Sequence, residues 1–170
     1  YMDEEYAKEL FDEIEIPGIG STGNRDMMFD NEFLDGPVPV YNFLEAEIDE
    51  EYLVILIGGD FPDDVKDQVS ELIEDHGDSS KVIVGSHYPP KKVGDKIHSG
   101  KRIGCEQFRE MIIKEKPAIW MNGHVHEDFG ERDLLGVPVI NAAAEETGKA
   151  FSVTIGDEGE AEEIEEIQLL

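Results

Sequence analysis

The chain has 170 residues, of which 39% are hydrophobic, and its 41 acidic and 14 basic side chains leave a formal net charge of -27. The length suits a single domain with a packed core, the composition is that of a globular protein, and the charge disfavours non-specific binding to nucleic acid or anionic membranes. No apolar run approaches the length of a membrane helix and the single cysteine, Cys105, excludes an internal disulfide, so we expect a cytoplasmic protein.

Apolar periodicity and turn residues predict the following elements in chain order. The first part of the chain has an amphipathic helix over 2–14, a short apolar piece broken by glycines over 16–26, and strands over 38–49 and 52–59. The middle part has a helix from 63 that ends at Gly77, a strand from 81 that stops at His87, and a helix from 105 that ends before Pro117. The last part has a strand from 118 into the segment 123–127, a strand over 137–144, and a final hairpin within 151–170 that turns through Gly156 and Gly159.

The alternation of strands with helices predicts a layered α/β domain. In such sheets, binding residues gather in the loops at the carboxyl ends of the strands. Four polar side chains stand at three predicted strand ends, each near a glycine or proline turn: Asn24, His87, His124 and His126. We therefore expect these four side chains to lie near one another.

These residue types suit a metal ion. Neutral imidazole is the commonest transition-metal ligand, and an asparagine amide oxygen suits a divalent ion that also accepts oxygen donors. A single histidine at a strand end is more often a hydrogen-bonded structural residue, and two histidines one residue apart also occur by chance. Four such residues in order at three strand ends favour a metal site over coincidence.

Three ordered motifs carry a resemblance to a known family. The sequences GNRD at 23–26, SHYPP at 86–90 and GHVHE at 123–127 resemble those of the calcineurin-like metallophosphoesterases, in particular the small archaeal and bacterial predicted phosphoesterases. The likeness extends from about residue 16 to about residue 155. It implies a layered α-β-β-α sandwich, formed here by one domain over 1–170 and incomplete at its N-terminal side.

The resemblance also implies a function and roles for the candidate residues. Asn24, His87 and His124 would hold one ion of a metal pair, and His126 would belong to the other. Manganese is the first choice for both ions, with iron, zinc and nickel as alternatives. The substrate would be a small-molecule phosphomonoester or phosphodiester, attacked in line by a metal-bound hydroxide. In so negative a chain, the metals would supply the positive charge that receives the phosphate.

The chain departs from the family pattern before the asparagine motif. The family begins with a D-x-H motif and a G-D-x-x-D motif, and their aspartates bridge the two metals. Here the residues that precede Asn24 read as a helix and contain neither motif. We expect the natural chain to extend before Tyr1, since translated chains begin with methionine; the alternative is a truncated and inactive relative.

Other acidic residues in the chain are also possible metal ligands. Gly59 begins a G-D-x-x-D sequence with Asp60 and Asp63, but this sequence lies after the asparagine motif, whereas the family's motif lies before it. For these aspartates, capping of the following helix is favoured over metal binding. Asp95 and His98 also pair an acid with a histidine, and their place in a polar loop predicts that both are solvated.

Arg25 is the candidate catalytic residue, and it departs from the family. Many members have histidine at this position, where it protonates the leaving oxygen or steadies the transition state. Arginine stays protonated and cannot act as a general acid, although it can grip a phosphate oxygen with two hydrogen bonds. A surface ion pair with Asp26 or Asp30 is an equally good interpretation of Arg25.

Two other functions remain open. The chain is alternatively a non-catalytic binding or regulatory protein with the metallophosphoesterase fold, because the bridging aspartates are missing. It is alternatively a mononuclear zinc hydrolase in which His87, His124 and His126 leave one position for water. The second alternative gives Asn24 no role.

Overall fold

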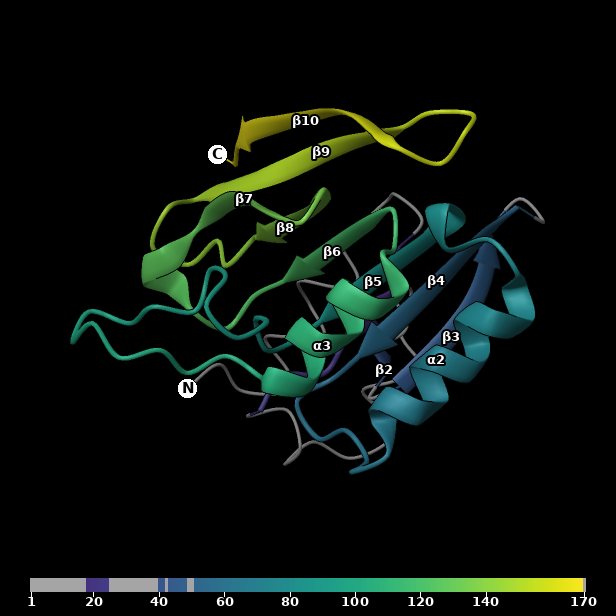
Figure 1. Cartoon of the computed structure of the whole chain (residues 1–170). Helices are drawn as coiled ribbons and strands as arrows, with labels where there is room; N and C mark the ends of the chain where they lie inside the picture. The colour runs from purple at the N-terminus through teal and green to yellow at the C-terminus, as the bar shows by residue number, and fades with distance from the viewer. Residues whose placement is uncertain (1–17, 25–39, 42, 49–50, 170) are drawn as a thin grey trace.

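The structure is a computed structural model that describes residues 18–24, 40–41, 43–48 and 51–169. Its main sheet has six strands in the order β3-β4-β5-β6-β8-β7 (Figure 1). These strands are β3 (Phe43–Ile48), β4 (Tyr52–Ile57), β5 (Val82–Ser86), β6 (Ile119–Asn122), β7 (Gly130–Leu134) and β8 (Val137–Asn141). The four central strands run parallel, and β3 and β7 pair antiparallel at the two edges.

Two helices cover the same face of this sheet (Figure 1). They are α2 (Val65–His76) and α3 (Glu106–Glu115), and two short 3-10 helices, η3 (Ser79–Lys81) and η4 (His126–Asp128), lie in the loops. The helix α2 ends at Gly77 as predicted, because this residue takes a left-handed φ of +82° that a side chain would strain. The predicted helix over 2–14 lies outside the described residues.

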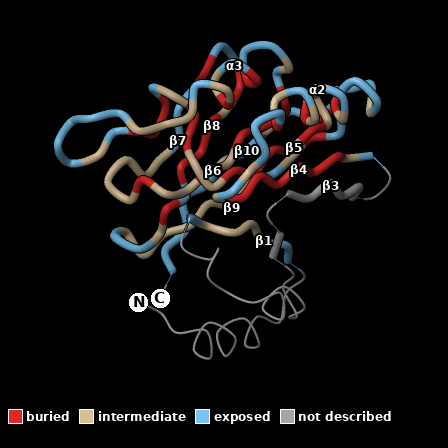
Figure 2. Tube along the Cα trace, turned by 90° about the horizontal axis from the view of Figure 1, so that it is seen from below, coloured by how far each residue is buried: buried red, intermediate tan, exposed pale blue. Residues whose placement is uncertain are grey.

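The hydrophobic core lies between the sheet and the two helices, and the sheet is also buried on its other face. Ile55 and Ile57 of β4 have no exposed surface and pack in the core with buried residues of both helices. Val54 and Leu56 alternate with them and are nearly as buried. This is the pattern of a central parallel strand, and Figure 2 shows the buried residues concentrated along β4 and β5.

The last two strands form a separate hairpin. The strand β9 (Lys149–Ile155) pairs antiparallel with β10 (Ala161–Gln168), which confirms the predicted hairpin and its turn. The turn is tied to the main sheet, since the Tyr52 hydroxyl donates a hydrogen bond of 2.8 Å to the carbonyl oxygen of Gly156. The remaining strands, β1 (Gly20–Ser21) and β2 (Val40–Tyr41), pair parallel with each other.

The layered α/β class is thus confirmed. The predicted strand over 38–49 is present as β2 and β3, and the strand from 118 ends at Asn122 because the chain turns there and then enters η4. The strand β7 was not predicted, and its residues GERDL are mostly polar. An edge strand with exposed side chains needs no apolar alternation, so this segment carried no signal.

Candidate functional site

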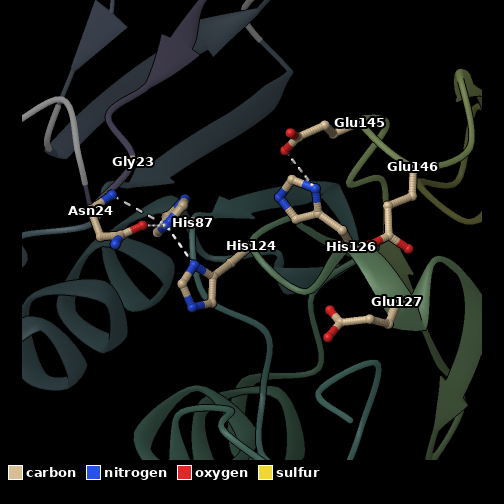
Figure 3. A pocket seen from close by; sticks show the side chains of 8 residues that line it. All are labelled: Gly23, Asn24, His87, His124, His126, Glu127, Glu145 and Glu146. Carbon is tan, nitrogen blue, oxygen red and sulfur yellow. Dashed lines mark hydrogen bonds and ion pairs between the residues drawn. The ribbon is translucent and has the colours of Figure 1, made fainter. Parts of the chain in front are cut away.

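The candidate residues meet where the central strands end. His87 directly follows β5, His124 follows β6, and Asn24 is carried by the described segment 18–24 to the same edge of the sheet. They line an open pocket of about 530 Å³ together with His126 (Figure 3). All four residues predicted as metal ligands therefore line one pocket, although whether they bind metal stays a prediction.

Three of the four residues converge closely. The Nε2 atom of His87 lies 2.9 Å from Oδ1 of Asn24 and 3.0 Å from Nδ1 of His124 (Figure 3). Two ligand atoms that each lie about 2.1 Å from a metal, at a right angle to each other, are separated by about 3 Å. Nε2 of His87 thus has the spacing of a neighbouring ligand both to the amide oxygen of Asn24 and to the imidazole of His124.

Gly59 brings Asn24 to the site. Its backbone N–H donates a hydrogen bond of 2.7 Å to the carbonyl oxygen of Thr22, so the segment 18–24 lies against the end of β4. A side chain at Gly59 would place its Cβ 2.5 Å from the backbone nitrogen of Asn24 and 2.5 Å from the carbonyl carbon of Gly23. Only glycine allows this approach, and this role of Gly59 was not among the predictions.

His124 is held in a left-handed backbone conformation. Its φ is +69°, which is uncommon outside glycine and is concentrated at functional sites. Burial is the main cause that lowers the pKa of His124, and the positive charge of a protonated His126 lowers it further, while Glu127 opposes the shift. The lower pKa favours the neutral imidazole, which is the form that binds metal.

Tyr88 packs against both histidines of the convergent group. Its ring lies edge-on to His87 and His124, with centroid distances of 4.8 and 4.6 Å. The Tyr88 carbonyl accepts a hydrogen bond of 2.8 Å from the Ser86 hydroxyl, which in turn accepts one of 2.9 Å from the buried indole of Trp120. The core thereby fixes the backbone on either side of His87.

Asn141 fixes the loop that carries His124 and His126. This side chain is 1% exposed, and its amide nitrogen lies within 3.1 Å of the carbonyl oxygens of Gly94, Val125 and Asp128. Its Oδ1 accepts a hydrogen bond of 3.1 Å from the backbone N–H of Ala143. One buried amide therefore joins the end of β8 to two neighbouring loops.

The opposite wall of the pocket is acidic. Nδ1 of His126 lies 2.9 Å from a carboxylate oxygen of Glu145, and Glu127 and Glu146 also line the pocket (Figure 3). Hydrogen bonds from backbone N–H groups, those of Glu127 itself and then of His98, lower the pKa of Glu127. The carboxylates give this pocket a negative charge.

Several other predictions have definite outcomes. Arg25 lies outside the described residues. Asp60 and Asp63 do not line the pocket, and their predicted capping role is not confirmed, because the N-cap residue of α2 is Asp64, which makes no side-chain capping bond. The prediction that Asp95 is solvated is wrong: its side chain has no exposed surface and forms an ion pair of 2.6 Å with Arg102.

Sequence reasoning missed Glu145 and Glu146. They follow β8, so the rule that selected the other strand ends would also have found them.

Within 18–24 and the other described ranges, no three side chains of His, Cys, Asp or Glu lie close enough to hold a metal ion. The convergent set in this part of the chain consists of two imidazoles and an amide.

Comparisons with known proteins support the fold. No family model matches the chain. A stretch of 49 residues is 33% identical to the UPF0046 protein T07D4.2 of Caenorhabditis elegans, and it takes in 28% of this chain but only 12% of that relative. None of the helices described here is long and apolar enough to cross a membrane.

Two crystal structures share the architecture over nearly the whole chain. One matches 98% of this chain and 72% of its own, with a TM-score of 0.72 and 16% identity. The other, of TT1561 from Thermus thermophilus, matches 97% of this chain and 79% of its own, with a TM-score of 0.66 and 14% identity. Similarity at this level of identity shows the fold, which agrees with the predicted α/β class.

Proposed function

We propose that this protein is a metal-dependent phosphoesterase of the calcineurin-like type. The observation that carries the proposal is the convergence of Asn24, His87 and His124 from three separate strand ends, with Nε2 of His87 about 3 Å from the donor atoms of the other two. The α/β fold, shared with the two crystal structures, supports the same conclusion.

The donor atoms fit a divalent cation. Asn24, His87 and His124 would hold one ion, and His126 would contribute to a second. Glu145 holds Nδ1 of His126, and a carboxylate in this position fixes the ring so that the other nitrogen is available as a ligand. When bound, a pair of such ions supplies Lewis acidity and an activated water for attack on phosphorus.

The charge of the pocket explains why a cation is required. Glu127, Glu145 and Glu146 line the pocket, while burial lowers the pKa of His124 and so disfavours a positive charge on its ring. A phosphate ester is an anion, and these carboxylates repel it unless cations neutralise them. We therefore propose divalent ions, with Mn²⁺ first, as part of the working site, and a small phosphomonoester or phosphodiester as the substrate.

A site that holds a single ion is the second candidate. It is favoured by the absence of a carboxylate from the convergent set within the described part of the chain. The two candidates differ in metal stoichiometry, which elemental analysis measures on the full natural protein after loading and dialysis. Two tightly held ions per chain exclude the single-ion candidate, and one ion excludes the dinuclear site.

The test of function is hydrolysis of bis(p-nitrophenyl) phosphate and p-nitrophenyl phosphate by the full natural protein with Mn²⁺. We expect turnover that is abolished by chelation and by His124→Ala. His76→Ala is the matched control, because His76 is the last residue of α2 and does not line the pocket. This variant should keep the wild-type rate of hydrolysis. No turnover by the metal-loaded protein on either ester would refute the proposal.

A further inference from the structure

A second pocket, of about 350 Å³, lies beside the loop that follows β5. Four basic side chains line it, Lys92, Lys96, Arg102 and Arg132, together with the carboxylates of Asp128 and Asp133. Four of the 14 basic residues of the chain thus share one hollow, in a protein whose net charge is -27. The volume is in the range of pockets that hold small molecules.

The acidic side chains of this pocket already have partners. Asp128 accepts a hydrogen bond of 2.9 Å from the backbone N–H of Lys96 and forms an ion pair of 2.9 Å with Arg132. Asp133 accepts a hydrogen bond of 3.1 Å from the backbone N–H of Gly136 in the turn after β7. These contacts hold the carboxylates in place and leave the two lysine side chains to other partners.

Among the residues that the structure describes, the lysines of this pocket have no carboxylate partner, unlike the lysines that form ion pairs on the helices and the hairpin. Lys66, Lys114 and Lys149 each form an ion pair with a glutamate. Lys92 and Lys96 form no ion pair with any carboxylate in the described residues, although acidic residues are abundant in the chain. Two ammonium groups that line one pocket and pair with no carboxylate repel each other, so an anion that contacts both is favourable.

The backbone around these lysines is held in unusual conformations. Lys92 has a φ of +68°, a left-handed conformation that strains a side-chain-bearing residue. The fully buried carboxylate of Asp95 holds it there, because it accepts a hydrogen bond of 2.9 Å from the backbone N–H of Lys92. The same carboxylate forms an ion pair with Arg102, so one buried acid positions two cations of the pocket.

We propose that this second pocket binds a phosphate group, either as the free ion or as a small-molecule phosphate monoester. Four cations face Asp128 and Asp133 of the lining and the buried Asp95 that pairs with Arg102, so the pocket keeps a net positive charge of +1, which favours an anion. Fixed guanidinium groups suit phosphate oxygens, and lysines add charge. This pocket and the metal site share no lining residue, although they adjoin where Glu127 of the metal site precedes Asp128 of the phosphate pocket. The phosphate pocket needs no metal.

The test is a titration of the metal-free chain with inorganic phosphate at low ionic strength, followed by amide chemical shifts in NMR spectra. We expect saturable shifts at Gly94 and its neighbours. A parallel titration with phenyl phosphate shows whether the monoester binds more tightly than the free ion. The double variant Lys92→Gln/Lys96→Gln should weaken phosphate binding at least about tenfold, since it removes the two unpaired charges.

The matched control is Lys66→Gln/Lys149→Gln, which changes the net charge by the same amount at two paired lysines, and it should bind as the wild type does. The metal-site variant His124→Ala should also bind normally. Absence of saturable binding, an equal loss in the control, or a loss in His124→Ala overturns the proposal. If the lysine variant does not fold, Arg132→Gln provides the same test from the other side of the pocket.

Discussion

The backbone N–H of Gly59 donates a hydrogen bond of 2.7 Å to the carbonyl oxygen of Thr22, and the space between their segments admits no side chain. We expect Gly59→Ala to displace Asn24 and to weaken Mn²⁺ binding by about tenfold or more, as loss of a ligand-positioning contact does. Isothermal titration calorimetry with the wild type and the variant measures this change.

The control for this variant is Gly123→Ala. A Cβ at Gly123 meets no atom within 4 Å, so this substitution should keep the wild-type affinity for Mn²⁺ within about twofold. An unchanged affinity in Gly59→Ala would show that Asn24 is not positioned by this contact.

Metal binding should stabilise the folded chain. At a Mn²⁺ concentration of about 100 times the dissociation constant, mass action adds about 2.7 kcal/mol to the free energy of unfolding. We expect urea denaturation curves to shift by this amount with Mn²⁺, to return after chelation, and to show no shift in His87→Ala, which removes the central member of the convergent group. A shift of equal size in this variant would place the ion elsewhere.

Asn24→Ala separates the proposed site from a zinc site made of three histidines. Its amide oxygen lies 2.9 Å from His87, so we expect the variant to lose at least about tenfold in affinity for Mn²⁺ and Zn²⁺. Calorimetric titration provides the measurement. Unchanged zinc affinity would favour binding by the histidines alone.

Asn141→Ala should destabilise the protein because it leaves the carbonyl oxygens of Val125 and Asp128 without their buried donor. We expect a loss of about 2–4 kcal/mol in the free energy of unfolding, measured in urea. Asn122→Ala is the control, since the one hydrogen bond described for that side chain is long, at 3.5 Å. Equal losses in the two variants would deny Asn141 a special role.

Asp95→Ala should cost about 3 kcal/mol of stability, because two backbone N–H groups and Arg102 lose a fully buried acceptor. The exposed carboxylate of Asp133 offers a comparison, and Asp133→Ala should cost less than about 1 kcal/mol. Thermal and urea denaturation of both variants measures the difference. A neutral effect of Asp95→Ala would mean that the loop is held by other contacts.

Several elements could be predicted from the chain because their signals are local. The strand β4 has a continuous apolar run, and α2 has apolar residues four positions apart at Val65, Val69 and Ile73. Each pattern indicates a buried strand or a helix with one buried face, whichever element packs against it. The turn of the last hairpin is likewise encoded by its own glycines. In contrast, β7 is a polar edge strand, and its pairing depends on a neighbour that its own residues do not specify.

The candidate site divides in the same way. The sequence alone determined that Asn24, His87, His124 and His126 follow strands in a layered α/β chain, because residue type and strand ends are local properties. Only the tertiary structure decided that Asn24 reaches the site through close backbone contact with Gly59, and that Asp95 is buried beside Arg102. The close approach of segments that are distant in the sequence depends on how the whole chain packs in three dimensions. A local pattern of residues therefore does not predict it.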